Sequence, residues 1–137
     1  MNSAVRDLVR ARARQRCEYC HLPDTADEWP FHVDHIVARA HGGDDEPSNL
    51  SWSCTQCNLH KGSNIASVDP QTAQGVDLFH PRLQKWEANF ELGSDGWITG
   101  LGPVGRATVR LLDMNGSPQL DLRRDLLNQN EFESNVP

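Results

Sequence analysis

The sequence predicts an α+β fold built around a structural zinc site. Three observations predict it. The four cysteines form two Cys-x-x-Cys pairs, a β-branched and aromatic segment lies between the pairs, and a short helical pattern overlaps the second pair. A chain of 137 residues suits a single domain over residues 1–137. Within it we expect a basic N-terminal helix (1–16), a zinc-bearing core (17–62) and a C-terminal helix and hairpin extension (63–137) that packs on the core.

The charge is unevenly distributed along the chain. The net charge of −6 argues against a protein that holds nucleic acid by bulk positive charge alone. Residues 1–16 nevertheless carry five arginines and one aspartate, whereas residues 17–50 carry eight acidic residues and one arginine. No apolar run approaches the roughly 20 residues that cross a bilayer, and the N-terminus lacks a secretory signal. We therefore expect a cytoplasmic protein without a membrane partner.

The cysteine spacing predicts a metal site. The pairs are Cys17 with Cys20 and Cys54 with Cys57, and no cysteine is left over. In a reducing compartment two such pairs suit tetrahedral zinc, whereas redox motifs occur singly and iron–sulfur clusters more often use other spacings. Four thiolates leave zinc no open position, so this ion would be structural. We expect His21, next to Cys20, to shield the thiolates and not to ligate.

The segment between the cysteine pairs predicts a hairpin followed by a helix. Residues 29–37 are typical of a strand, residues 41–47 of a turn, and residues 49–53 of a second, antiparallel strand. A helix is expected from Thr55 to Lys61, capped by Ser53 or Thr55 and ended by Gly62.

Three side chains of this unit suit phosphodiester hydrolysis. Asp34 and Asn58 offer oxygen ligands, and the imidazole of His35 is a base that titrates near neutrality. Strand alternation would send Asp34 and His35 to opposite faces, so they converge only if the strand ends or bulges there. Taken alone, the dipeptide is more typical of a surface carboxylate beside an ordinary strand histidine.

The order of these motifs resembles the HNH endonuclease family in its zinc-bearing form. The elements are Cys17-x-x-Cys20, Val33-Asp34-His35-Ile36-Val37, Gly42-Gly43, Asn49-Leu50 and Cys54-x-x-Cys57-Asn58-x-x-Lys61-Gly62. The resemblance covers residues 17–62 and implies the ββα-metal (HNH/His-Me finger) unit.

The resemblance also implies a function, metal-dependent hydrolysis of DNA. His35 would be the general base, Asp34 and Asn58 would hold a catalytic divalent ion, and Asn49 would orient the His35 ring by a hydrogen bond. Asn58 stands where many members have histidine, and its amide oxygen favours Mg²⁺ or Mn²⁺. This ion, distinct from the zinc, would contact the phosphate and the leaving 3′ oxygen, which leaves a 5′ phosphate. The alternative is a non-catalytic, zinc-stapled nucleic-acid-binding module.

Other side chains near this unit have more than one interpretation. Arg39 and Lys61 are candidate phosphate contacts, although Lys61 equally suits a helix C-terminus. His32 is either a neighbour of the metal or an ordinary strand histidine. His41 and His60 have no assigned role, and the oligomeric state stays open.

The flanking segments predict further helices. Residues 3–16 form an amphipathic pattern whose arginines lie along DNA phosphates or solvate the outer face. Residues 77–99 predict a core-packing helix and a hairpin turning at 93–96, with Phe79, Trp86, Phe90 and Trp97 in the core. Pro103 begins a helix that runs through Met114, a last helix begins at Ser117-Pro118, and residues 128–137 form a polar end.

Overall fold

The computed structural model describes residues 2–130, which form small antiparallel hairpins and helices. The elements are α1 (Ser3–Arg12), β1 (His32–His35), β2 (Leu50–Ser53), α2 (Thr55–Lys61), β3 (Ala66–Val68), β4 (Gly75–Asp77), α3 (Trp86–Asn89), β5 (Phe90–Leu92), β6 (Ile98–Gly100), α4 (Pro103–Leu111) and α5 (Gln119–Asn128). The strands pair as β1–β2, β3–β4 and β5–β6. The predicted α+β class is confirmed.

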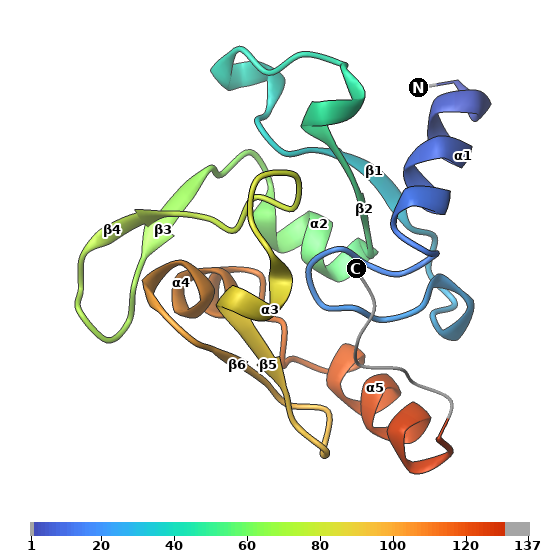
Figure 1. The fold of residues 1–137 in the computed structure, drawn as a ribbon, viewed down its shortest axis with the longest axis vertical. Coiled ribbons are helices and arrows are strands. Elements are labelled where there is room, and N and C mark those ends of the chain that lie inside the picture. The colour runs from blue at the N-terminus through green and yellow to red at the C-terminus, as the bar shows by residue number, and fades with distance from the viewer. Residues whose placement is uncertain (1, 131–137) are drawn as a thin grey trace.

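The β1–β2 hairpin is the centre of the predicted core. Its antiparallel register places His35 opposite Leu50 and Asp34 opposite Ser51. Only four residues of the predicted strand 29–37 are in β1, because Pro30 lacks the N–H that a ladder needs and the chain turns away after His35. Helix α2 follows β2 directly, and Figure 1 shows it between this hairpin and the C-terminal elements.

Helix α1 is shorter than predicted. It ends at Arg12, and the two residues Arg14 and Gln15 adopt positive φ angles of 53° and 63°. This turn carries the chain into the first cysteine pair, where the Glu18 N–H donates to the Trp52 carbonyl at 2.9 Å. The helical pattern of residues 13–16 is therefore overridden by the contact between the first cysteine pair and β2.

The C-terminal extension is only partly as predicted. The β3–β4 hairpin was not expected, and α3 is a single turn. The hairpin turning at residues 93–96 and the helix starting at Pro103 are both present, although that helix ends at Leu111. Helix α5 begins at Gln119, directly after the predicted Ser117-Pro118 start. Of the predicted polar end, residues 131–137 lie outside the described residues.

One cluster of buried side chains joins the core and the extension. It contains residues from α1, both cysteine pairs, β2 and the segment from Phe79 to Met114. Phe79, Trp86 and Phe90 are buried as predicted, whereas Trp97 is 49% exposed and not part of this core. The Trp86 indole N–H donates to the Tyr19 carbonyl at 2.7 Å, which ties the extension to the first cysteine pair.

Within the extension, an ion pair joins α4 to the β3–β4 hairpin. The Arg106 guanidinium on α4 donates to both oxygens of Asp69, at 2.9 and 2.8 Å, just after β3. This contact holds the pKa of Asp69 well below its usual range. None of the described helices has the length and apolar character that a bilayer span requires.

Candidate functional site

The four cysteines form one buried cluster. Their Sγ atoms all lie within 4.8 Å of one another, and those of Cys20 and Cys54 are 3.7 Å apart. Four thiolates around zinc at about 2.3 Å would have sulfur–sulfur separations of about 3.8 Å. The backbone N–H of Cys57 donates to Cys54 Sγ at 3.3 Å, and that of Cys20 to Cys17 Sγ at 3.4 Å. The cluster therefore has the donor set and the spacing of a structural zinc site.

The second cysteine pair also begins α2. The N-cap is Cys54, whose sulfur accepts the Cys57 N–H, so the predicted caps Ser53 and Thr55 are wrong. The Thr55 hydroxyl instead donates to the Pro30 carbonyl at 2.6 Å. The position and the start of α2 are thus set by a residue of the metal cluster.

His21 lies beside the cluster without belonging to it. Its ring stacks on Trp86 with centroids 3.8 Å apart, and burial lowers the pKa of His21 to about 3. Among the described residues, the group of metal-type donor atoms here consists of the four cysteines.

Asp34, His35 and Asn58 surround one open depression of about 500 Å³. The lining residues are Val33, Asp34, His35, Ala38, Arg39, Asn58, Gly62 and Ser63. Strand β1 ends at His35, which is how two adjacent residues reach the same depression despite strand alternation. Asn58 comes from α2, four residues after Cys54. The structure therefore brings together a carboxylate, an imidazole and an amide.

The carboxylate of Asp34 is buried and paired with Lys61. Asp34 Oδ2 lies 3.2 Å from Lys61 Nζ, and Lys61 Nζ also donates to the His35 carbonyl at 3.0 Å. Burial raises the pKa of Asp34, and the charge of Lys61 opposes that rise. Lys61 is only 2% exposed, so the predicted contact between Lys61 and a DNA phosphate is wrong.

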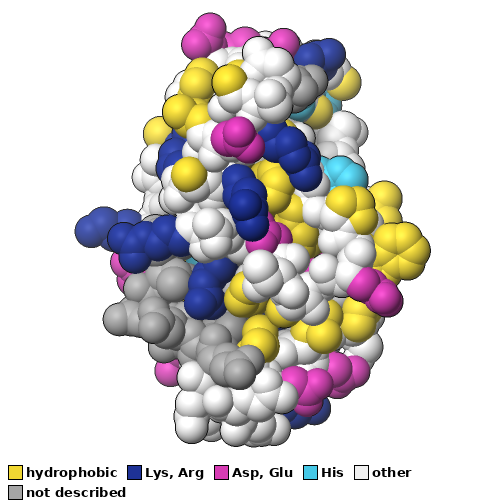
Figure 2. Space-filling model, turned by 90° about the vertical axis from the view of Figure 1, so that its right-hand side faces the viewer, with side chains coloured by type: hydrophobic (Ala, Val, Ile, Leu, Met, Phe, Trp, Pro, Cys, Tyr) yellow, Lys and Arg dark blue, Asp and Glu magenta, His cyan; other side chains and the backbone are white. Residues whose placement is uncertain are grey.

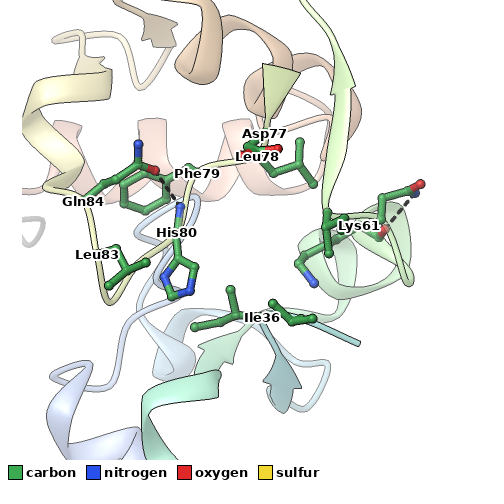
Figure 3. A pocket seen from close by; sticks show the side chains of 11 residues that line it. Ile36, Lys61, Asp77, Leu78, Phe79, His80, Leu83 and Gln84 are labelled. Carbon is green, nitrogen blue, oxygen red and sulfur yellow. Dashed lines mark hydrogen bonds between the residues drawn. The ribbon is translucent and has the colours of Figure 1, made fainter. Parts of the chain in front are cut away.

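A separate cavity of about 380 Å³ lies on the other side of this ion pair. Figure 3 shows Lys61, Ile36, Leu78 and His80 among the residues around it. Lys61 lines this cavity and not the depression, whereas Asp34 lines the depression and not this cavity. The Asp34–Lys61 pair thus forms part of the wall between the two spaces.

The ring of His35 is held by a residue that sequence reasoning missed. His35 Nε2 lies 2.7 Å from Asp45 Oδ1, and Arg39 donates to the same oxygen at 2.9 Å. These two hydrogen bonds lower the pKa of Asp45, and the one with His35 has the larger effect. An ionised carboxylate only accepts, so Nε2 carries the proton and Nδ1 of the neutral ring is left as an acceptor. The only sequence signal was the acidic run 44–46, which does not single out Asp45.

Asn49 does not orient the His35 ring as predicted. Its amide oxygen accepts the Val37 N–H at 2.9 Å, and its amide nitrogen donates to the Val37 and Asp44 carbonyls at 3.0 and 2.8 Å. The amide is used by the loop after β1, which leaves it no bond to the imidazole. Asn49 instead braces the loop that carries Asp45.

We expect Asn49→Ala to destabilise the protein by about 1–3 kcal/mol, because partly buried backbone groups of Val37 and Asp44 lose their side-chain partner. Urea unfolding measures this loss. Asn128→Ala, the same change at an exposed position of α5, serves as the control and should keep close to wild-type stability. Equal stability of Asn49→Ala and the wild type would contradict the bracing role.

The remaining histidines of the core lie away from the depression. The Thr55 hydroxyl donates to Pro30, so it accepts from His32 Nε2, 3.1 Å away. Through this hydrogen bond, His32 connects β1 to α2. His41 and His60 are exposed.

The arginines of α1 attach the helix to the hairpin and to the segment that follows the first cysteine pair. Arg10 pairs with Asp24 at 2.7 Å, Arg12 donates to the Leu50 carbonyl at 2.7 Å, and Arg6 lies 4.7 Å from the Trp52 ring centre. Figure 2 faces the α1 side and shows basic side chains in a broken band across it. These arginines therefore have a structural role, whether or not they also contact DNA phosphates.

Comparison with known protein families supports the same core. The family model described as HNH endonuclease matches residues 17–64. Residues 17–64 are therefore the segment that matches an HNH domain. The HNH domain contains all four cysteines and every residue that lines the depression, whereas residues 65–137 lie beyond the match. Searches of curated proteins and of solved structures return no match to the chain. HNH domains typically act on nucleic acids, so the domain indicates a nuclease-type or nucleic-acid-binding function.

Proposed function

We propose that this protein is a metal-dependent DNA endonuclease whose active site is the depression in the HNH domain. The observation that carries the proposal is the convergence of Asp34, His35 and Asn58 on one open space beside the cysteine cluster. A binding module has no need of this combination, because phosphate contacts require positive charge and hydrogen-bond donors. Hydrolysis, in contrast, requires a base and a means of neutralising charge on the phosphate.

Each side chain has a separate role in the proposed reaction. His35 takes a proton from the attacking water at Nδ1, while Asp45 holds Nε2 and so fixes the ring and its tautomer. Asp34 and Asn58 offer the hard oxygen ligands that Mg²⁺ and Mn²⁺ prefer. When bound there, the ion supplies positive charge to the phosphate and to the leaving 3′ oxygen, so the products carry 5′ phosphates.

The test is nicking of supercoiled plasmid by the wild-type protein with added Mg²⁺ or Mn²⁺. Loosely bound divalent ions are removed by gel filtration, because a strong chelator would also strip the cysteine site. We expect ion-dependent nicks, and mapping of the ends should give 5′ phosphates and 3′ hydroxyls. Cleavage without a divalent ion, or ends with 3′ phosphates, would contradict the proposed chemistry.

A second candidate function is a non-catalytic nucleic-acid-binding module. The observation in its favour is the ion pair with Lys61, which already satisfies the charge of Asp34. Such a module would shift DNA in a binding assay and leave the plasmid intact with either ion.

Arg39 is the best-placed phosphate contact of the depression. Its side chain is 69% exposed, and its partner Asp45 is also exposed. We expect Arg39→Gln to weaken DNA binding equally for all sequences and to reduce the slope of log K against log salt by about 1. Binding is measured by fluorescence anisotropy in the absence of divalent ions, so that the DNA stays intact. Arg110→Gln, the same change at an exposed position on α4, is the control and should keep the wild-type slope.

A further inference from the structure

We propose that Lys61 is a built-in counter-ion that keeps the divalent-cation site weak until a DNA phosphate occupies it. This inference rests on the proposed function and extends it to the order in which ion and substrate bind. It makes Lys61 a positioning residue that acts through Asp34, and the DNA phosphate becomes part of the ion's ligand set.

The charged side chains that line the depression, taken together with their ion-pair partners, sum to zero. Asp34 contributes one negative charge, Lys61 contributes one positive charge at 3.2 Å from Asp34 Oδ2, and the amide of Asn58 contributes none. Two nearby charges, Arg39 and Asp45, also cancel each other. A divalent ion entering this site meets a carboxylate whose charge is already balanced, and it is repelled by the ammonium group beside it.

Lys61 is held in place and does not swing away easily. Its side chain is 2% exposed, and Nζ is also bonded to the His35 carbonyl at 3.0 Å. The residue ends α2 immediately before Gly62, whose positive φ of 54° caps the helix. Removing a buried lysine from its carboxylate is costly, so the pair should persist while an ion binds.

A small part of Asp34, 8% of its side chain, is exposed, and this residue lines the depression. Lys61 lines the cavity drawn in Figure 3, and Asp34 lines the depression together with Asn58. Lys61 therefore contacts Asp34 from the cavity side, and an ion can approach from the depression. A phosphodiester placed in the depression adds the negative charge that the protein itself lacks there, which explains how a weak site becomes a strong one.

The experiment measures Mn²⁺ binding by electron paramagnetic resonance at pH 8, with His35→Ala in every protein so that DNA stays intact. Lys61→Met in this background removes the counter-ion. Lys85→Met removes the same charge at an exposed lysine that is not among the residues lining the depression and serves as the control. Zinc content and circular dichroism confirm that each protein is folded. Lys61→Gln is measured in parallel, because it keeps a hydrogen-bond donor for the His35 carbonyl and carries the test if Lys61→Met does not fold.

In the free protein, we expect the Lys61 variants to bind Mn²⁺ at least about tenfold more tightly than the His35→Ala parent, and Lys85→Met to match the parent. A short DNA duplex should tighten Mn²⁺ binding by the parent at least about tenfold and tighten binding by the Lys61 variants less. Unchanged Mn²⁺ affinity in the Lys61 variants would overturn the inference, and so would a parent that binds Mn²⁺ equally with and without DNA.

Failure of this inference is distinguishable from failure of the proposed function. If the wild type nicks plasmid with Mg²⁺ while the Lys61 variants bind Mn²⁺ like the parent, the counter-ion role is wrong and the nuclease stands. If the wild type does not nick plasmid and the His35→Ala parent shows no Mn²⁺ binding with DNA, the ion site itself is wrong and both proposals are overturned.

Discussion

Cys57→Ser is expected to leave the protein largely unfolded. Cys57 is fully enclosed, lies in the four-sulfur cluster and donates its N–H to the Cys54 sulfur that caps α2. Metal binding in such sites is worth about 10–16 kcal/mol of folding free energy. That is as large as the total stability of an ordinary domain, which is about 5–15 kcal/mol.

The measurement is circular dichroism with thermal unfolding, alongside metal analysis of the purified protein. Wild-type protein treated with a chelator should show the same loss of structure, and added zinc should restore it, which separates loss of metal from damage by the serine. Metal-free Cys57→Ser with an unchanged melting temperature would refute a structural role for zinc.

His35→Ala is expected to reduce plasmid nicking by about 10²–10⁴-fold, the range typical for loss of a general base. The fold should survive, because the His35 side chain is partly exposed and the contacts of this residue with β2 and with Lys61 are made by its backbone. Initial rates of nicking at saturating Mg²⁺ measure the loss.

The matched control for that variant is His60→Ala. His60 is an exposed histidine on α2, and it is not among the residues that line the depression. We expect this variant to nick at close to the wild-type rate. Retention of most activity by His35→Ala, or an equal loss in His60→Ala, would remove the assignment of His35 as the base.

The parts of the fold that follow from short spacings were predictable. The two cysteine pairs and the helix from Thr55 to Lys61 are local patterns, and both appear at the predicted residues. The β3–β4 hairpin was missed because each strand is only three residues long and both have an exposed, intermediate, exposed pattern, which gives no hydrophobic alternation. The length of α1 was overestimated because contacts of the first cysteine pair, absent from any local pattern, end it.

The site shows the same division. Asp34, His35 and Asn58 carry chemistry that their residue types reveal, and they line a single depression. The partners of Asn49 depend on the path of the loop after β1, and those of Lys61 depend on which face of α2 is buried. Neither feature can be predicted from a short stretch of sequence. Asp45 was one carboxylate in an acidic run until the fold placed it 2.7 Å from an imidazole.

The sulfur of Cys54 both joins the four-cysteine cluster and caps α2, so the rotation of that helix is set by the cluster. Asn58 follows Cys54 by four residues and Lys61 follows by seven, which places both on the helix face above the cap. One residue inserted after Cys57 would turn everything beyond it by about 100° while the sulfurs stay where they are. Zinc content would then report an intact protein in which the side chains of Asn58 and Lys61 both point the wrong way.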